Sequence, residues 1–323
     1  MLISTVTGQQ VDKIPEKGFA LALGCFDGLH VGHAALFRSL LSHAGESRLC
    51  AAAWTFAPPR DGGLCPVKRK PRLISFQEKL ERLAALGVYY AFVYEFSDVA
   101  DLSPEKFVSE ILLRECSCRL AVCGYNFTFG KRAAGNAQCL SSLLADAGAA
   151  TVVVPPVAVN GKTVSSAAIR AALAAGDTET VAAMLGRPYT ITSTVVTGQH
   201  LGTALGFPTV NQSFFEGAAL PRFGVYAGRT EVGGSFFPSV TNVGVRPTVS
   251  QTDIPNAETH LLGFSGNLYG AVVRVSLERF LREEHRFSSE EELAAAVRAD
   301  IAEAYRTETT RQEKENAEGG KQA

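Results

Sequence analysis

The chain has almost no imbalance of charge. Its 323 residues include 31 Lys and Arg against 32 Asp and Glu, which gives a formal net charge of -1. Without a net basic field there is no sign of a nucleic-acid partner. No apolar run reaches the length of a membrane span, and the first residues lack a signal-peptide pattern. We therefore expect a cytoplasmic protein that binds neither nucleic acid nor membranes.

Cysteine is present, but without the spacing of a disulfide framework or of a zinc site. The seven cysteines are scattered, and all of them lie in the first half of the chain. An odd, unpatterned set fits reduced thiols, and the absence of finger-like pairs argues against zinc. Because 46% of the residues are apolar, the chain is able to bury a sizeable core, and its length suits two domains.

The most informative segment is the ten-residue stretch GCFDGLHVGH, which ends at His33. It follows the apolar run 19–23, which predicts a buried strand, and it precedes residues at helical spacing. His30 and His33 thus lie where a strand turns into a helix, and Gly28 and Gly32 allow close backbone approach. A helix N-terminus with two imidazoles favours a polyphosphate ligand and nucleotidyl transfer. The alternatives for the two histidines are solvated loop residues or half of a metal site.

The first half of the chain alternates predicted strands with predicted helices. This pattern implies a parallel sheet in an open α/β fold, in which ligands bind at the carboxyl ends of the strands. Helix starts are predicted by a capping box from Ser75 to Glu78 and by Ser103 before a proline. The candidate strands are 19–23, 49–54, 89–94, 119–123 and 151–154.

After about residue 186 the pattern changes to short β-rich segments punctuated by Gly and Pro, which predicts a small antiparallel barrel. A capping box from Ser288 to Glu291 predicts a final helix. The polar tail is expected to be disordered. The predicted domains are 1–185, 186–306 and the tail 307–323, and the barrel strands are 189–196, 224–229, 239–243 and 271–277.

A second phosphate-handling pattern lies in the barrel region. Gly198, Gly202 and Gly206 are spaced for a loop whose backbone wraps phosphates. Thr209 and Asn211 alternate, so in an extended segment both side chains face the same way and offer oxygen ligands for Mg²⁺. The glycine pattern alone is weak, and a turn-rich hairpin is its alternative.

Glu258 is the candidate general base of the barrel region. On a strand, Glu258, His260 and Leu262 share one face. A carboxylate there is able to accept the proton of a substrate hydroxyl that attacks the γ-phosphate of ATP. An exposed strand glutamate is the alternative, and His260 is expected to be a packed or surface residue.

With these motifs in order, the chain resembles the prokaryotic bifunctional riboflavin kinase/FAD synthetase family over roughly residues 15 to 305. The resemblance implies a Rossmann-like nucleotidyltransferase domain, then a riboflavin kinase-like barrel with a C-terminal helix. The motifs that carry it are 24–33, 123–130 with Gly135, 164–170, 206–211, 242–248, 258–262, 268–270 and 280–282.

The family relation implies two reactions that both use ATP and Mg²⁺. Riboflavin takes the γ-phosphate of ATP to give FMN, and FMN attacks the α-phosphate of a second ATP to give FAD and pyrophosphate. The implied catalytic residues are His30, His33, Arg170 and Glu258, and Thr209 and Asn211 would hold the metal. The ATP phosphates are assigned to Gly24, Phe26, Asp27, Gly28, Gly32, Ser165, Ser166, Gly198, Gly202 and Gly206.

Two side chains, Asp27 and Arg282, have two possible roles each, and a third, Asn126, has one role that is only broadly defined. Asp27 either contacts Mg²⁺ or the ATP end of the site, or it caps the turn structurally. Arg282 either covers flavin or nucleotide or forms a structural ion pair, and Asn126 is expected to face the nucleotide or flavin. The sequence does not set the oligomeric state.

The chain departs from the family pattern at four places. A histidine usual after Phe56 is missing, with Arg60 nearby, and Ala167, Ser193 and Thr203 replace usual residues. Each loss of a charged contact would cost on the order of 1–3 kcal/mol. Two alternatives therefore stand beside the bifunctional enzyme: a riboflavin kinase with weakened adenylyltransferase activity, and a non-catalytic flavin-binding regulator.

Overall fold

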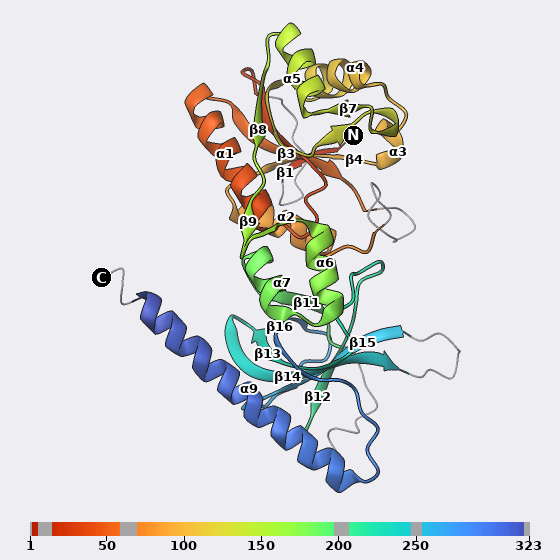
Figure 1. Ribbon diagram of the computed structural model, residues 1–323, viewed down its shortest axis with the longest axis vertical. Coiled ribbons are helices and arrows are strands. Elements are labelled where there is room, and N and C mark those ends of the chain that lie inside the picture. The colour runs from red at the N-terminus through yellow and green to blue at the C-terminus, as the bar shows by residue number, and fades with distance from the viewer. Residues whose placement is uncertain (1, 6–14, 59–69, 197–206, 247–253, 320–323) are drawn as a thin grey trace. The chain divides into compact units, whose positions relative to one another are not determined.

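The computed structural model describes residues 2–5, 15–58, 70–196, 207–246 and 254–319 (Figure 1). The chain divides into two compact units, each with its own sheet. The first unit comprises residues 1–168 together with 216–219, and the second comprises 169–215 and 220–323.

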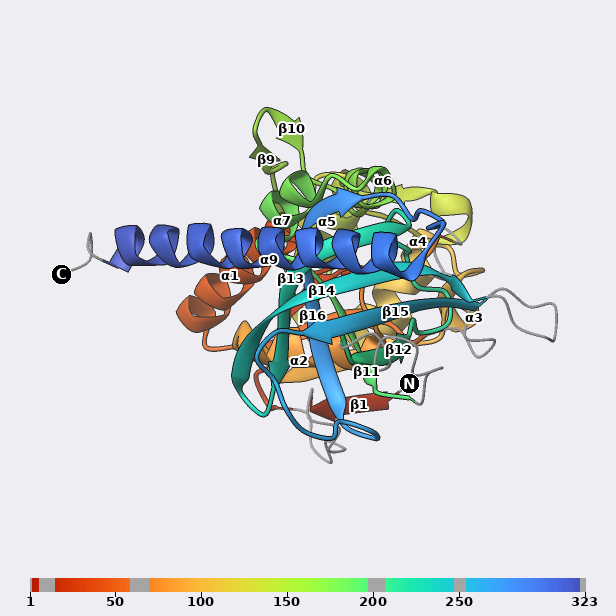
Figure 2. The same ribbon diagram turned by 90° about the horizontal axis from the view of Figure 1, so that it is seen from below.

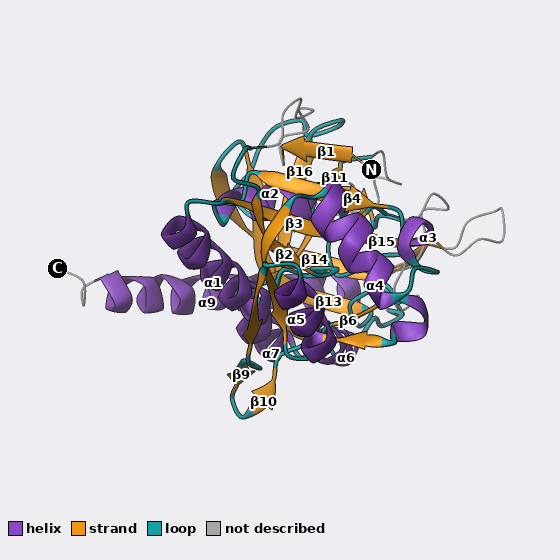
Figure 3. Ribbon diagram, turned by 90° about the horizontal axis from the view of Figure 1, so that it is seen from above, coloured by secondary structure: helices purple, strands orange, loops and turns teal. Residues whose placement is uncertain are grey.

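The sheet of the first unit has the strand order β1-β4-β3-β2-β5-β8, and Figure 3 labels its strands β1, β4, β3 and β2. All neighbours are parallel except the edge strand β1, which runs antiparallel to β4. The parallel strands thus follow the doubly wound order, and the order reverses between β2 and β5, where such folds bind ligands. The strands are β1 (Leu2–Thr5), β2 (Phe19–Leu23), β3 (Cys50–Phe56), β4 (Tyr90–Tyr94), β5 (Cys118–Gly124) and β8 (Ala150–Val154).

Helices cover both faces of this sheet, because the central strand β2 carries apolar residues on both of its sides. In β2 the large residues Phe19, Leu21 and Leu23 pack on one face, and Ala20 and Ala22 pack on the other. The large residues meet the π-helical segment η1 (Phe107–Glu115) and α5 (Ala137–Asp146). The alanines meet α1 (Val31–Ser47) and α2 (Phe76–Ala85), whose aliphatic side chains fill the space that the small residues leave.

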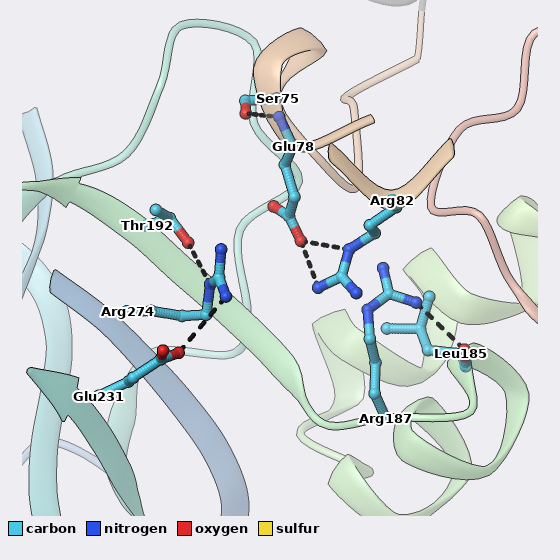
Figure 4. Close-up of polar contacts among 8 residues, drawn as sticks. All are labelled: Ser75, Glu78, Arg82, Leu185, Arg187, Thr192, Glu231 and Arg274. Atoms are coloured by element: carbon cyan, nitrogen blue, oxygen red, sulfur yellow. Dashed lines mark hydrogen bonds and ion pairs between the residues drawn. The ribbon is translucent and has the colours of Figure 1, made fainter. Parts of the chain in front are cut away.

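The predicted helix starts of this unit are confirmed. The Ser75 hydroxyl accepts a hydrogen bond from the N–H of Glu78 at 3.1 Å, and the Glu78 carboxylate accepts one from Arg82 (Figure 4). Ser103 caps α4 (Pro104–Lys106) in the same way. The β9–β10 hairpin is a short projection (Figure 2). The smaller elements are α3 (Phe96–Val99), α4 (Pro104–Lys106), β6 (Thr128–Phe129), η2 (Lys131–Ala133), β7 (Gly135–Asn136), β9 (Ala158–Val159) and β10 (Lys162–Thr163).

The second unit is an antiparallel sheet with the order β11-β16-β13-β14-β15-β12. A single bridge between Val196 and Asn211 joins the chain beyond β11 to β12, so the curled sheet meets itself at one end. Arg274 ties the sheet together by donating to Thr192 and to Glu231 (Figure 4). The elements are α7 (Thr178–Leu185), β11 (Tyr189–Thr194), β12 (Thr209–Ser213), β13 (Gly224–Val232), β14 (Ser235–Arg246), β15 (Ile254–Leu261), β16 (Val272–Arg282) and α9 (Glu290–Gly319). Helix α6 (Ser166–Ala175) begins in the first unit and ends in the second.

Helix α9 corrects two expectations about the C-terminal region. Its capping serine is Ser289, whose hydroxyl accepts from the N–H of Glu292, one residue later than the predicted box. The helix also continues to Gly319, so residues 307–319 are helical, whereas the sequence was expected to lose structure there. The continuation is supported by pairs one turn apart, such as Arg311 with Glu308, which stabilise a polar helix.

The fold class predicted from the sequence is confirmed in both units. The parallel sheet with helices comes first, and the antiparallel sheet with its C-terminal helix follows. Helix α9 packs through Ala304 on the sheet face that carries Val225, Ala227 and Val240. Among the described residues, no helix is both long enough and apolar enough to cross a membrane.

Candidate active sites

The turn after β2 has a strained backbone. Phe26 and Leu29 have φ values of 51° and 39°, in a region that side chains other than glycine rarely adopt. Gly28 has a φ of 84°, which explains why glycine stands there. Strain of this kind persists only where surrounding structure holds it, and it concentrates at functional sites.

The two predicted histidines lie together at this turn. His30 is the N-cap of α1, and its Nδ1 accepts a hydrogen bond from the N–H of His33 at 3.2 Å. The two rings stack with their centroids 3.6 Å apart, and the Phe26 ring meets His33 edge-on. Gly32 leaves room for the His30 ring, because a Cβ there would lie 3.1 Å from it.

The imidazole of His33 is held in its neutral form. Burial lowers its pKa well below the usual value, and the nearby charges of His30 and Lys79 lower it further. Its Nδ1 is buried and has no hydrogen-bond partner among the residues that the structure describes. A buried polar atom without a partner marks a place where a ligand or water is expected.

Backbone and side-chain hydrogen bonds hold the turn from several elements. The Asp27 carboxylate accepts a hydrogen bond from the N–H of Leu73 at 2.8 Å. Of the two roles expected for Asp27, this contact supports the structural one. The Ser166 hydroxyl donates to the carbonyl of Asp27 at 2.9 Å. Ser165 accepts from the N–H of Ala168 and thereby begins α6.

A pocket opens beside the turn, between the end of β3 and the start of α2. Lys79 is buried in its wall, and its ammonium donates to the carbonyl of Cys25 at 2.9 Å. Sequence reasoning missed Lys79, and the only signal for it was a lysine on the apolar side of an amphipathic helix. The lining residues are Cys25, Asp27, Phe56, Ala57, Pro58, Arg72, Ile74, Phe76 and Lys79.

In the second unit, three polar side chains form a row across adjacent strands. Glu258 on β15 is directly opposite Asn211 on β12 and, on its other side, Asn242 on β14. Residues directly opposite in an antiparallel pair project from the same face. Thr209 shares this face because it lies two residues from Asn211 and opposite His260.

Further polar contacts surround Glu258. The Asn256 amide donates to the Glu258 carboxylate at 3.3 Å, and the Asn242 amide donates to Glu284 at 3.0 Å. The predicted strand 239–243 contains Asn242 and is part of the longer strand β14, and strand register brings Asn242 beside Glu258. His260 packs by its ring against Phe207 and contacts the carbonyl of Pro208, as a surface residue would.

Arg282 forms an ion pair with Asp300 of α9. Its Nε lies 3.1 Å from one carboxylate oxygen, and its Nη2 lies 2.8 Å from the other. Asp300 is buried, with 6% of its surface exposed. The structural alternative for Arg282 is therefore the one with an observed partner.

Replacement of Asp300 by Asn should destabilise the second unit by about 3 kcal/mol, because it leaves a largely buried guanidinium without its anion. Urea unfolding measures this change. The matched control is Arg279→Met, which removes an exposed pair to Glu303 and should cost less than about 1 kcal/mol. A raised KM for the flavin with unchanged stability would instead assign Arg282 to ligand binding.

Comparisons with known proteins cover both units. The family model described as FAD synthetase matches residues 12–168, and the model described as riboflavin kinase matches residues 185–307. The chain is 33% identical over 290 residues to a bifunctional riboflavin kinase/FMN adenylyltransferase of Bacillus subtilis (strain 168), covering 88% of this chain and 91% of the relative. Against the protein of the same name from Escherichia coli (strain K12) it is 32% identical over 292 residues, covering 90% and 93%.

The chain belongs to the bifunctional riboflavin kinase/FMN adenylyltransferase family. This confirms the resemblance on which the sequence analysis relied. A solved chain titled "Crystal Structure of Macrolide-efflux Protein from Streptococcus pneumoniae" shares the fold, with a TM-score of 0.79 at 24% identity, covering 93% of this chain and 96% of that one. At that identity the likeness concerns the fold alone.

Some of the predicted site residues lie outside both the histidine turn and the row around Glu258. Asn126 is exposed in the turn after β5, at the carboxyl edge of the same sheet as the histidines. Arg170 lies on α6, four residues beyond Ser166, but in the second unit, and its role stays a prediction. Gly24 begins the histidine turn, and its N–H donates to the carbonyl of Trp54.

Some predictions fall outside the described residues. The loop glycines Gly198, Gly202 and Gly206 are among them, and so are Arg60 and Thr203. Ser193 is described on β11, where its hydroxyl is buried and has no partner within the described part of the chain. The phosphate-wrapping role of the loop therefore stays a prediction.

Proposed function

We propose that this chain phosphorylates riboflavin to FMN in its barrel domain and adenylylates FMN to FAD in its N-terminal domain. The observation that carries the proposal is the pairing of two chemically distinct clusters with the two matching family models: the stacked histidines at the doubly wound switch point, and the Asn211–Glu258–Asn242 row. The domains are proposed as 1–185 and 186–306, and the enzyme as a cytoplasmic one. None of the six described cysteines forms a disulfide with another described cysteine, which agrees with that location.

For the kinase step, Glu258 is proposed as the general base. It accepts the proton of the flavin hydroxyl while that oxygen forms a bond to the γ-phosphorus of ATP and the bond to ADP breaks. The Asn256 amide holds one Glu258 oxygen by a hydrogen bond and so limits the directions in which the carboxylate points.

For the adenylyl step, the histidine turn is proposed to bind the ATP phosphates. An oxygen of the FMN phosphate attacks the α-phosphorus, and the bond to pyrophosphate breaks. His30 and His33 donate to oxygens on which negative charge develops, and the N-terminus of α1 adds its free N–H groups. His30 uses Nδ1 as an acceptor within the turn, so in the neutral ring Nε2 carries the proton and is the nitrogen that would donate to a phosphate oxygen.

The donor set around Thr209 and Asn211 fits Mg²⁺. A hydroxyl and an amide oxygen are neutral hard donors, and the Glu258 carboxylate lies across the strand pair from Asn211. Sites of this kind bind the metal together with substrate phosphates, because Mg²⁺ combines few protein ligands with phosphate oxygens and water. When bound, the ion would neutralise charge on the ATP phosphates.

The experiment that tests the proposal incubates the purified chain with ATP and Mg²⁺, once with riboflavin and once with FMN, and separates the flavins by chromatography. We expect FMN and then FAD from riboflavin, and FAD from FMN directly. Failure of both reactions sinks the proposal and leaves the flavin-binding regulator. FMN formation without FAD formation in either incubation supports the kinase with a weakened adenylyltransferase.

A further inference from the structure

Lys79 is a buried cation that the proposed reactions do not use. It lies on α2 with 8% of its surface exposed. Its ammonium donates to the Cys25 carbonyl at 2.9 Å and approaches the Thr55 hydroxyl at 3.5 Å, and it also lies over the Phe76 ring. Among the described residues no carboxylate pairs with it. A buried positive charge without an anion is costly, which makes it a candidate for function.

The position of Lys79 connects it to the histidine turn. Cys25 lies between Gly24 and Phe26, and its carbonyl also accepts from the Thr55 hydroxyl at 3.2 Å. Phe26, the next residue, is one of the two with strained φ values. Lys79 and Thr55 thus hold the start of the turn from α2 and β3, while Leu73 holds Asp27 further along.

The charge of Lys79 also reaches the histidines. The ring of His30 stacks on His33, and the ring of Phe26 meets it edge-on. Lys79 contacts the carbonyl of Cys25, the residue before Phe26, and its charge is one cause of the lowered pKa of His33. A fixed cation at the base of a turn that carries two imidazoles favours a polyphosphate.

We propose that Lys79 is a positioning residue for adenylyl transfer: it holds the Cys25 carbonyl and supplies a permanent positive charge at the base of the phosphate-binding turn. This inference rests on the proposed function of the N-terminal domain. It also gives the turn a cation other than the histidine that the family usually carries after Phe56.

The test compares Lys79→Met and Lys79→Arg with the control Lys106→Met, the same change at an exposed lysine of the same unit. We expect Lys79→Met to lower kcat for FAD formation from FMN about 10²-fold. Lys79→Arg should recover a tenth or more of the wild-type rate. The riboflavin kinase rate of the same preparations should not change, and the urea unfolding curve of each variant checks that the N-terminal unit is folded.

A second measurement does not depend on turnover. The proton NMR titration of the His33 ring, assigned with His33→Gln, should shift to a higher midpoint in Lys79→Met, because removal of a nearby cation raises the pKa. The midpoint should stay in place in Lys106→Met and in Thr55→Val, which removes one donor to the Cys25 carbonyl but keeps the charge. Thr55→Val should lower kcat less than Lys79→Met.

Two outcomes overturn the inference. One is a Lys79→Met variant that matches Lys106→Met in both FAD formation and the His33 midpoint. The other is a Lys79→Met variant that loses FAD formation together with kinase activity and folded protein. If Lys79→Arg does not restore FAD formation either, Lys79 has a structural role only. If the wild type forms no FAD, the adenylyltransferase assignment fails, and the His33 titration still decides whether Lys79 sets the charge at the turn.

Discussion

Glu258→Gln should lower the riboflavin kinase rate by about 10²–10⁴-fold, the usual contribution of a general base, and leave adenylylation of FMN unchanged. The substitution keeps the shape of the side chain and its place between Asn211 and Asn242, but an amide does not accept the proton of the flavin hydroxyl. The measurement is the initial rate of FMN formation with saturating riboflavin and ATP, beside FAD formation from FMN. Flavin binding should persist, because the general base acts on the proton and the flavin contacts remain.

A matched control separates the general-base role from a general effect of charge. Glu290→Gln makes the same change at an exposed carboxylate at the start of α9, outside the row. Its kinase rate should stay within a few-fold of the wild type. Equal kinase rates for Glu258→Gln and Glu290→Gln would mean that Glu258 is not the base, whatever the activity of the wild type.

His33→Gln should have the opposite selectivity, with FAD formation from FMN about 10²–10³-fold slower and the kinase rate preserved. The variant removes a ring that stacks on His30 and whose buried Nδ1 has no partner among the described residues. The control is His43→Gln, on the same helix, where the ring Nδ1 contacts the carbonyl of Ser39 at 2.8 Å. A normal FAD rate in His33→Gln would remove the histidine turn from the proposed site.

The stability of the protein should depend on pH through His33. Its pKa is lowered in the folded state, so below the ordinary value of about 6.5 the unfolded chain binds more protons than the folded one. The free energy of unfolding should therefore fall as the pH drops below about 6.5, and it should level off above that value. Urea unfolding at several pH values measures this, and His33→Gln should flatten the curve. An equally steep curve in His33→Gln would assign the pH dependence to other groups.

Much of the fold could be predicted because it depends on local pattern. The run 19–23 is confirmed as β2 with both ends in place, since apolar residues before a glycine-rich turn have few other structures available. The caps at Ser75 and Ser103 were equally readable, because an N-cap involves a hydroxyl and an N–H three residues away. The extent of α9 was misjudged because polar composition resembles disorder until pairs one turn apart are counted.

In the candidate sites too, local features could be predicted from the sequence, and contacts between distant segments could not. The sequence by itself determined the strand–turn–helix with His30 and His33 and the alternation of Thr209 and Asn211, because these depend on neighbours within a few residues. Only the tertiary structure decided that Asn242 lies beside Glu258, which is a matter of strand register. It alone also decided that Lys79 contacts the carbonyl of Cys25, 54 residues away. Contacts between distant segments follow from how sheets and helices pack, and no spacing within the chain records them.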